Sequence, residues 1–286
     1  MRMTVSGANL FFDIEGMGLA PSGTAMVAKE PCFVLHGGPG MDHSYFKPWL
    51  SPLTDTLQLI YVDHRGTGRS DRVALETCTI EQMADDIEAM RLHLGLDRVT
   101  VLGNTFGGMW ALVYALRHPQ HLSRLILVST TPSHEFVQAA EQEAERRATA
   151  AQKEAMPAVF EGRIETEEEY RRWWDIMLPL YFHRWDARIG TAMIERGINN
   201  PRVAAHMFRH EIPKYDVRPR LGEVNVPTLI VAGRHDWVTP VGESEQIATG
   251  IRGSKLVIFE NSGHMPFMEE QIAFIDVVTR FITGGS

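Results

Sequence analysis

Two kinds of hydrophobic pattern alternate along this chain. Short runs of consecutive apolar residues, typical of strands buried on both faces of a sheet, lie at residues 32–35, 57–62, 98–102, 125–128, 226–232 and 255–259. Residues 9–14 predict one more strand, in an opening hairpin with the residues before Gly7. Residues 16–31 are rich in Gly, Pro and Ser, and we expect them to form a loop.

Amphipathic segments between these runs predict helices. In residues 80–94 the apolar positions share one helical face, and Thr79 with Gln82 three residues later is a capping-box signal. Further helices are expected over about 106–117 and 268–282. Strands alternating with helices indicate the α/β class, with a mostly parallel central sheet flanked by helices.

One segment departs from this alternation. From about 133 to 215 the pattern is helical and charged, and it contains no buried strand run. We therefore expect a core domain made of residues 1–132 and 216–286, with residues 133–215 inserted as a helical cap, or lid.

The strongest chemical signal is the sequence VLGNTFGG at 101–108, which follows an expected strand and opens an expected helix. This is the context of the G-x-S-x-G nucleophile elbow, in which a sharp turn pushes the central side chain out at the top of the sheet. Here the central residue is Thr105.

Two later motifs supply partners in the order nucleophile, acid, histidine. Asp236 follows the strand at 226–232, and His264 follows the strand at 255–259. Both lie at carboxyl ends of strands, where open α/β sheets place their sites. We expect His264 to take the hydroxyl proton and Asp236 to orient the imidazole and stabilise its charged form. Helix capping is the competing interpretation of Asp236.

A glycine-rich loop, HGGPG at 36–40, directly follows the first core strand. Its backbone N–H groups can face a developing oxyanion because no side chains stand in the way. We expect the N–H of Gly38 and the N–H of Phe106, the residue after the nucleophile, to form the oxyanion hole. The loop DHRGTGRS at 63–70 lacks the lysine and the spacing of a phosphate-binding loop and is expected to be structural.

Together, HGGPG at 36–40, DHRGTGRSD at 63–71, GNTFGG at 103–108, GRHD at 233–236 and SGH at 262–264 resemble the α/β-hydrolase fold. The HGGPG form is similar to the proline iminopeptidase-like branch. The resemblance covers about 30–132 and 216–283, and it implies hydrolysis of small esters, lactones, amides or N-terminal residues without a cofactor. It departs from the branch at Asn104 and Phe106, where a tryptophan-containing elbow is usual, and at Thr105, which matches the nucleophile only as threonine.

Threonine is an unusual occupant of this position. An elbow residue has strained angles with φ > 0, which are least favourable for a β-branched side chain, and the extra methyl restricts rotation and crowds the acyl carbon. We therefore interpret Thr105 as a substituted serine, engineered or naturally divergent, that impairs the chemistry.

Candidate substrate contacts are Gly37 in the glycine-rich loop and the cap aromatics Trp173, Trp174, Tyr181 and Trp185, for which packing inside the cap is the alternative. Cap carboxylates of the iminopeptidase branch bind the substrate's free amine, and Glu211 is the candidate here, against a solvated surface role. Three functions stay open: a carboxylesterase or lactonase, which we favour; an iminopeptidase-type aminopeptidase; and a non-catalytic ligand-binding homologue.

The charge of the chain indicates which kinds of partner it is unsuited to bind. The chain has 28 Lys and Arg against 36 Asp and Glu, a net charge of −8, which disfavours nucleic acids and anionic membrane surfaces. No apolar run approaches the length of a membrane span. Residues 1–7 have no apolar h-region and no cleavage-site pattern, so we do not expect them to be a signal peptide. The chain has only two cysteines, which is typical of reduced thiols, so we expect a cytoplasmic protein. From the motifs we expect a small-molecule acyl substrate, no metal and no cofactor. The sequence does not indicate the oligomeric state.

Overall fold

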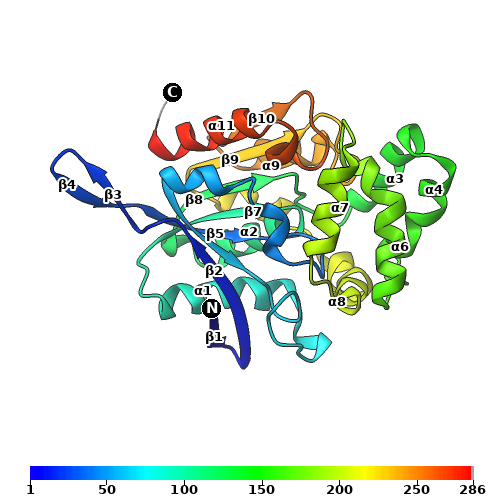
Figure 1. Cartoon of the computed structure of the whole chain (residues 1–286), viewed down its shortest axis with the longest axis horizontal. Coiled ribbons are helices and arrows are strands. Elements are labelled where there is room, and N and C mark those ends of the chain that lie inside the picture. Colours follow the sequence, from blue (N-terminus) through cyan, green and yellow to red (C-terminus); the bar gives the residue numbers. More distant parts are fainter. Residues whose placement is uncertain (285–286) are drawn as a thin grey trace.

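A computed structural model describes residues 1–284 of the chain. At its centre lies an eight-stranded sheet of order β1-β2-β6-β5-β7-β8-β9-β10 (Figure 1). The opening hairpin is antiparallel, β2 pairs antiparallel with β6, and every later pair is parallel. The strands are β1 Arg2–Val5, β2 Ala8–Glu15, β5 Glu30–Leu35, β6 Leu57–Val62, β7 Val99–Asn104, β8 Leu122–Val128, β9 Thr228–Gly233 and β10 Lys255–Phe259.

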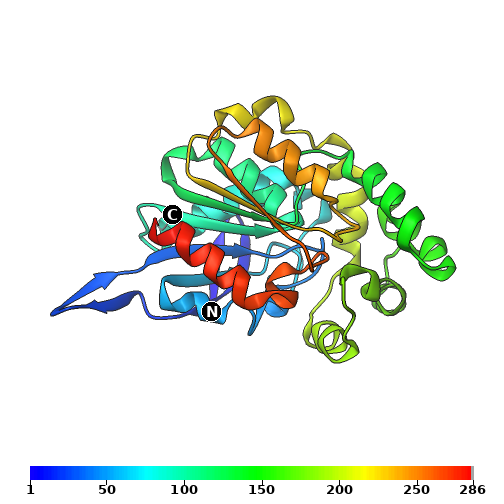
Figure 2. The ribbon, with the colours of Figure 1, turned by 90° about the horizontal axis from the view of Figure 1, so that it is seen from above.

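Helices cover both faces of this sheet, as the alternating pattern predicts. Figure 2 shows α2 (Phe106–Arg117) and α9 (Val241–Gly250) on one side and α11 (Gln271–Thr283) on the other. Helix α1 (Ile80–His93) packs against α2. The Thr79 hydroxyl accepts the backbone N–H of Gln82, so half of the predicted capping box forms. The helix expected over 268–282 is divided into α10 (Pro266–Glu269) and α11.

The central strands are buried because both faces of the sheet are covered. All six residues of β7 and all six of β9 are buried, as continuous apolar runs predict for interior parallel strands. Strands β7 and β9 both pair in parallel with β8, so their carboxyl ends lie at the same end of the sheet. The residues that follow the two strands, Thr105 and Arg234 onward, therefore begin at that end.

The prediction that residues 16–31 form a loop is wrong for residues 19–28. Strands β3 (Leu19–Ser22) and β4 (Ala25–Ala28) form a separate two-stranded antiparallel sheet. Gly23 makes the turn between them with φ 60°, a left-handed conformation that glycine adopts without steric cost. The small Gly, Pro and Ser residues that indicate a loop therefore lie in and around a hairpin.

Helices alone fill the chain between β8 and the segment that leads into β9. They gather at one end of the sheet (Figure 1) and comprise α3 Phe136–Arg147, α4 Ala150–Ala155, α5 Pro157–Phe160, α6 Glu167–Met177, α7 Ala187–Arg196 and α8 Pro201–His206, with a π-helical turn, η6, at Met207–Glu211. Residues Ser133 and Asp216 form an isolated antiparallel bridge at the base of this segment. We call the segment 133–215 the cap.

None of the helices within residues 1–284 is long and apolar enough to cross a membrane.

Candidate active site

Strand β7 and helix α2 meet in a sharp turn at Thr105. Its backbone has φ 51° and ψ −114°, an arrangement that costs on the order of 1–3 kcal/mol in a non-glycine residue. The turn requires close approach of strand and helix: a Cβ added to Gly103 would lie 2.2 Å from the carbonyl oxygen of Gly107. The strained position thus has the geometry of a nucleophile elbow.

His264 and Asp236 meet beside this turn. His264 Nδ1 lies 2.8 Å from Asp236 Oδ2, and both side chains are almost fully buried. Asp236 is held by three further donors: the N–H groups of Val238 and Thr239 donate to Oδ1, and the Thr239 hydroxyl donates to Oδ2. Donation from Nδ1 to the carboxylate would leave Nε2 of His264 free to accept a proton.

The Thr105 side chain directs its methyl group at the glycine-rich loop. A Cβ built on Gly37 would lie only 1.7 Å from Thr105 Cγ2, so the methyl occupies the space next to the Gly37 backbone. Within residues 1–284 no hydrogen bond is formed by Thr105 Oγ1. Thr105 and His264 nevertheless line the same cavity, and catalytic hydrogen bonds are often loose before substrate binds.

The methyl position predicts a specific coupling between residues 37 and 105. Gly37→Ala should destabilise the protein by about 1–3 kcal/mol through overpacking, and much less in the Thr105→Ser protein, which lacks Cγ2. Urea unfolding of the four proteins gives the coupling energy, expected to exceed about 1 kcal/mol. Gly222→Ala is the matched control, because a Cβ there meets nothing within 4 Å. Equal destabilisation by Gly37→Ala in both backgrounds would rule out this placement of the methyl.

Two backbone N–H groups next to Thr105 have no hydrogen-bond partner within residues 1–284. Neither Gly38 N nor Phe106 N donates a hydrogen bond within the described chain, and Gly38 lines the cavity. His36 Nδ1 lies 2.7 Å from the Gly37 carbonyl oxygen, and its Nε2 lies 3.2 Å from Thr67 Oγ1, so the ring ties this loop to residues 63–70. That these two unpaired N–H groups form an oxyanion hole stays a prediction.

Tyr45 lines the cavity but was not predicted from the sequence, and Asn104 was noted only as a departure from the usual elbow sequence. The Tyr45 hydroxyl accepts the N–H of Gly37 at 2.7 Å and donates to Asn104 Oδ1 at 2.9 Å, and Asn104 Nδ2 donates to the Val128 carbonyl. Burial raises the pKa of Tyr45 above its usual range, which keeps the hydroxyl proton available for this bond. Tyr45 therefore ties the glycine-rich loop to the elbow strand.

The cavity above Thr105 is small and mostly apolar. Its volume is about 20 Å³, room for about one water molecule, and its lining residues are Gly38, Met41, Tyr45, Asn104, Thr105, Trp174, Tyr181, Val238, His264 and Met265. Two of the four predicted cap aromatics, Trp174 and Tyr181, are among them. The Tyr181 carbonyl also accepts the His264 N–H at 2.7 Å, so the cap directly contacts the histidine loop.

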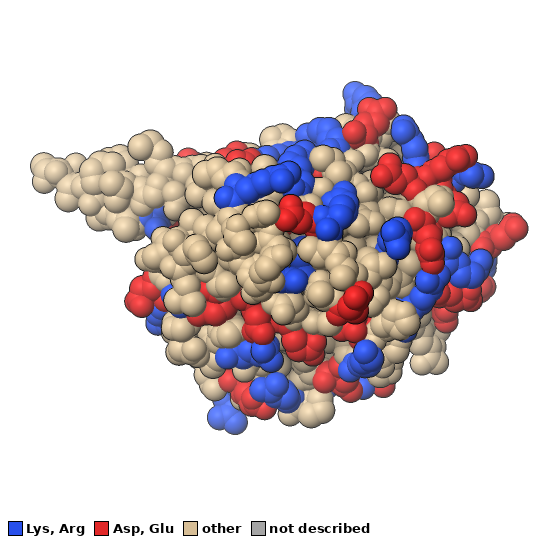
Figure 3. All heavy atoms as spheres, turned by 90° about the horizontal axis from the view of Figure 1, so that it is seen from below, with Lys and Arg blue, Asp and Glu red and all other residues tan. Residues whose placement is uncertain are grey.

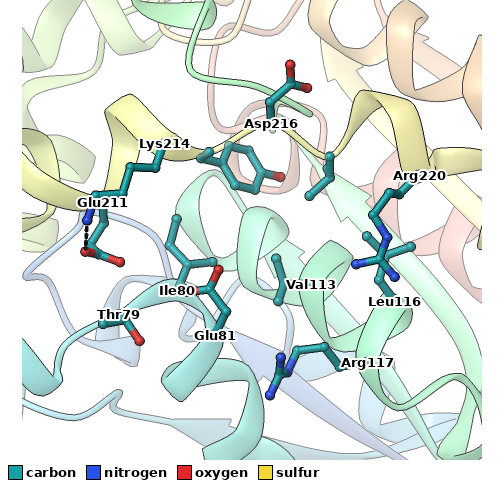
Figure 4. A pocket seen from close by; sticks show the side chains of 12 residues that line it. Thr79, Ile80, Glu81, Val113, Leu116, Arg117, Glu211, Lys214, Asp216 and Arg220 are labelled. Carbon is teal, nitrogen blue, oxygen red and sulfur yellow. Dashed lines mark hydrogen bonds and ion pairs between the residues drawn. The ribbon is translucent and has the colours of Figure 1, made fainter.

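Four predicted substrate contacts do not line the cavity. Gly37 is not among the lining residues, because its N–H bonds to Tyr45 and the Thr105 methyl lies against it. Trp173 is buried in the cap, where its Nε1 donates to the Ala155 carbonyl. Trp185 is 40% exposed and lies in a shallow hollow with Arg171 and Asp175. Glu211 lies in a different groove, of about 470 Å³, between helices α1 and α2 and residues 211–220, where the cap ends and the chain returns to the core (Figure 4).

Glu211 is paired in that groove. Its carboxylate lies 3.2 Å from Lys214 Nζ, as the dashed line in Figure 4 shows, while Glu81 and Arg117 extend from the opposite helices. None of Thr105, Asp236 and His264 lines this groove. The structure thus separates Glu211 from the residues that it was expected to assist.

Known proteins share both the sequence and the architecture of the chain. The alpha/beta hydrolase fold family matches residues 31–271. "Proline iminopeptidase PfmaB" of Pestalotiopsis fici is 30% identical over 273 residues, 93% of each chain. Among solved structures, an esterase of Exiguobacterium antarcticum superposes with a TM-score of 0.76 at 23% identity, covering 98% of this chain and 97% of the other.

An enol-lactonase of Burkholderia xenovorans has a TM-score of 0.77 at 20% identity, with 99% of this chain and 100% of the other covered. At 20% and 23% identity, these solved structures establish only that the fold is shared. The family match and the 30% identical relative establish that the chain belongs to the family. The chain belongs to the alpha/beta hydrolase fold family, with proline iminopeptidases among its relatives.

Proposed function

We propose that the protein is a carboxylesterase or lactonase that acts on small substrates with apolar acyl groups, and that position 105 carries its nucleophile. The family and the buried His264–Asp236 pair both support acyl-transfer chemistry. The observation that supports esters or lactones over amines is the lining of the cavity: none of its ten lining residues carries a carboxylate. A substrate bearing a free ammonium group would find no anionic partner there.

The proposed reaction has two halves. His264 Nε2 takes the proton of the residue 105 hydroxyl as its oxygen attacks the substrate carbonyl, and the N–H groups of Gly38 and Phe106 stabilise the negative charge on the carbonyl oxygen. The protonated His264 then donates to the leaving alcohol. Water, activated by the same histidine, releases the acid from the acyl-enzyme.

Substrate entry must displace the cap. The 20 Å³ cavity cannot hold an acyl group, and the cap is held on the core through Asn200, whose N–H donates to the Gly40 carbonyl at 2.7 Å, and through the N–H of Ile198, which donates to Asp42. Opening of these contacts is expected to precede binding, as in other enzymes with lids.

An aminopeptidase of the iminopeptidase type is the second candidate, because curated relatives carry that name. The two are separated by turnover in the Thr105→Ser protein of matched aryl esters and proline aryl-amides. We expect esters of short apolar acids to be turned over at least about tenfold faster, since the missing anionic partner costs binding of a charged amine. Turnover restricted to substrates with a free amine would overturn the proposal and favour the aminopeptidase.

A further inference from the structure

The hairpin of β3 and β4 projects from the body of the molecule as an arm (Figures 1 and 3). We define the arm as residues 16–28. Every residue of its two strands is exposed except Ala20, which is half-buried. It is therefore a two-stranded sheet with no core of its own, and such hairpins are at best marginally stable in water.

The surface of the arm is uncharged and apolar. Residues 16–28 include no Asp, Glu, Lys or Arg, although the chain as a whole carries a charge of −8. Met17, Leu19, Met26 and Val27 are exposed by 73%, 49%, 56% and 46%. In Figure 3 the arm is tan throughout, while charges of both signs cover the adjacent body. Contiguous exposed apolar surface of this kind marks an interaction site.

Hydrogen bonding along the hairpin determines which edge of the arm can accept another strand. The N–H of Lys29 donates to the Gly18 carbonyl, so Gly18 and Lys29 form a hydrogen-bonded pair. Alternation along the antiparallel register then makes Leu19–Ala28 and Pro21–Met26 non-hydrogen-bonded pairs, whose backbone groups point away from the hairpin.

The two edges of the arm are therefore unequal. Along β3 the outward groups belong to Leu19 and Pro21, and proline has no N–H to donate, which weakens this edge for strand pairing. Along β4 the outward groups belong to Met26 and Ala28, and both offer an N–H and a carbonyl. The arm thus presents one usable edge, on β4.

We propose that β4 pairs antiparallel with β4 of a second copy of this chain, with the two-fold axis at Val27. In this register Met26 of one copy lies opposite Ala28 of the other, so the four outward N–H groups meet four carbonyls. The result is a four-stranded sheet, which reaches the number of strands that independent stability requires. The β3 edges of that sheet carry Pro21, so pairing stops at a dimer.

The register of β4 supports a second copy as the occupant, because Met26 and Ala28 of one strand match Ala28 and Met26 of the same strand in another copy. Two chains of net charge −8 repel each other, and the arm is a surface on which they can meet without bringing like charges together. The contact is isologous, as two-fold dimers require, because the same strand serves both copies. Since a hairpin contact is small, we expect a reversible dimer whose population rises with concentration.

The first test measures mass by sedimentation velocity over a range of protein concentrations. The unaltered protein should approach twice the chain mass of 32.2 kDa at the highest concentrations. Val27→Glu places like charges opposite each other at the axis and should weaken the dimer at least tenfold. Ile272→Glu is the matched control, since Ile272 is an exposed apolar residue on α11, outside the arm, and it should leave association unchanged.

The second test locates the contact by crosslinking. Cys32 and Cys78 are fully buried, so an introduced cysteine is the accessible thiol. Val27→Cys should form an intermolecular disulfide under mild oxidation, because the two Val27 residues face each other as a non-hydrogen-bonded pair with Cα atoms about 4.5 Å apart. Leu19→Cys is similarly exposed but lies on the far strand, and it should stay monomeric on denaturing gels.

Several results would overturn the proposal. These are a monomer at all concentrations, a dimer that Val27→Glu leaves intact, and equal crosslinking of Val27→Cys and Leu19→Cys. Binding of a monomer to neutral phosphatidylcholine vesicles, lost on Val27→Glu, would instead assign the arm to a lipid surface and overturn the dimer as well.

Discussion

Thr105→Ser is expected to raise the turnover of short-chain aryl esters by about 10- to 100-fold. The substitution removes the methyl group that lies against Gly37 and replaces a β-branched residue at φ 51°. Relief of strain worth on the order of 1–3 kcal/mol, if expressed in the transition state, corresponds to rate factors of this size. Steady-state kinetics of the two purified proteins, with active-site titration, measure the change.

The control for this experiment is Thr105→Ala, which also removes the methyl but supplies no hydroxyl. It should fall below the unaltered protein, whereas relief of crowding alone would make it faster. Turnover by Thr105→Ser that does not exceed that of the unaltered protein would contradict the interpretation of Thr105 as a substituted serine.

His264→Ala, introduced into the Thr105→Ser protein, is expected to lower kcat by about 10⁴-fold or more, because the hydroxyl then has no proton acceptor. Circular dichroism and thermal unfolding check that the fold survives. Asp236→Asn should lower kcat by a comparable factor, since the imidazole would lose the carboxylate that fixes its tautomer.

A second histidine provides the matched control for this loss. His235 directly precedes Asp236 but stacks on His183, with ring centroids 3.8 Å apart, and does not line the cavity. His235→Ala should leave kcat within a few-fold. If His264→Ala and His235→Ala affected kcat equally, His264 would not be the general base.

Much of the core could be predicted because its signals are local. Interior parallel strands must be apolar on both faces, so runs such as 57–62 and 226–232 identify them directly. The same strands end at one edge of the sheet, which is why motifs far apart in sequence, at Asp236 and His264, predict a shared site. The hairpin at 16–31 was missed because its small residues bury nothing and leave no hydrophobic periodicity.

The parts of the site that could not be predicted depend on tertiary packing. Tyr45 is 59 residues from Asn104 along the chain, and no local pattern indicates that their side chains meet. Trp173 and Trp174 are adjacent in α6, where successive side chains point about 100° apart, so only one of them reaches the cavity. Which one it is, and where Glu211 lies, is set by how the cap helices pack.

The most direct test of the account is covalent labelling. The Thr105→Ser protein is treated with a fluorophosphonate, and its intact mass and labelled peptide are measured. The proposed mechanism predicts one adduct per chain, on residue 105, formed rapidly when His264 is present and slowly in the His264→Ala protein. An unlabelled protein, or an adduct on another residue with residue 105 unmodified, would contradict the claim that position 105 is the nucleophile of a competent hydrolase site.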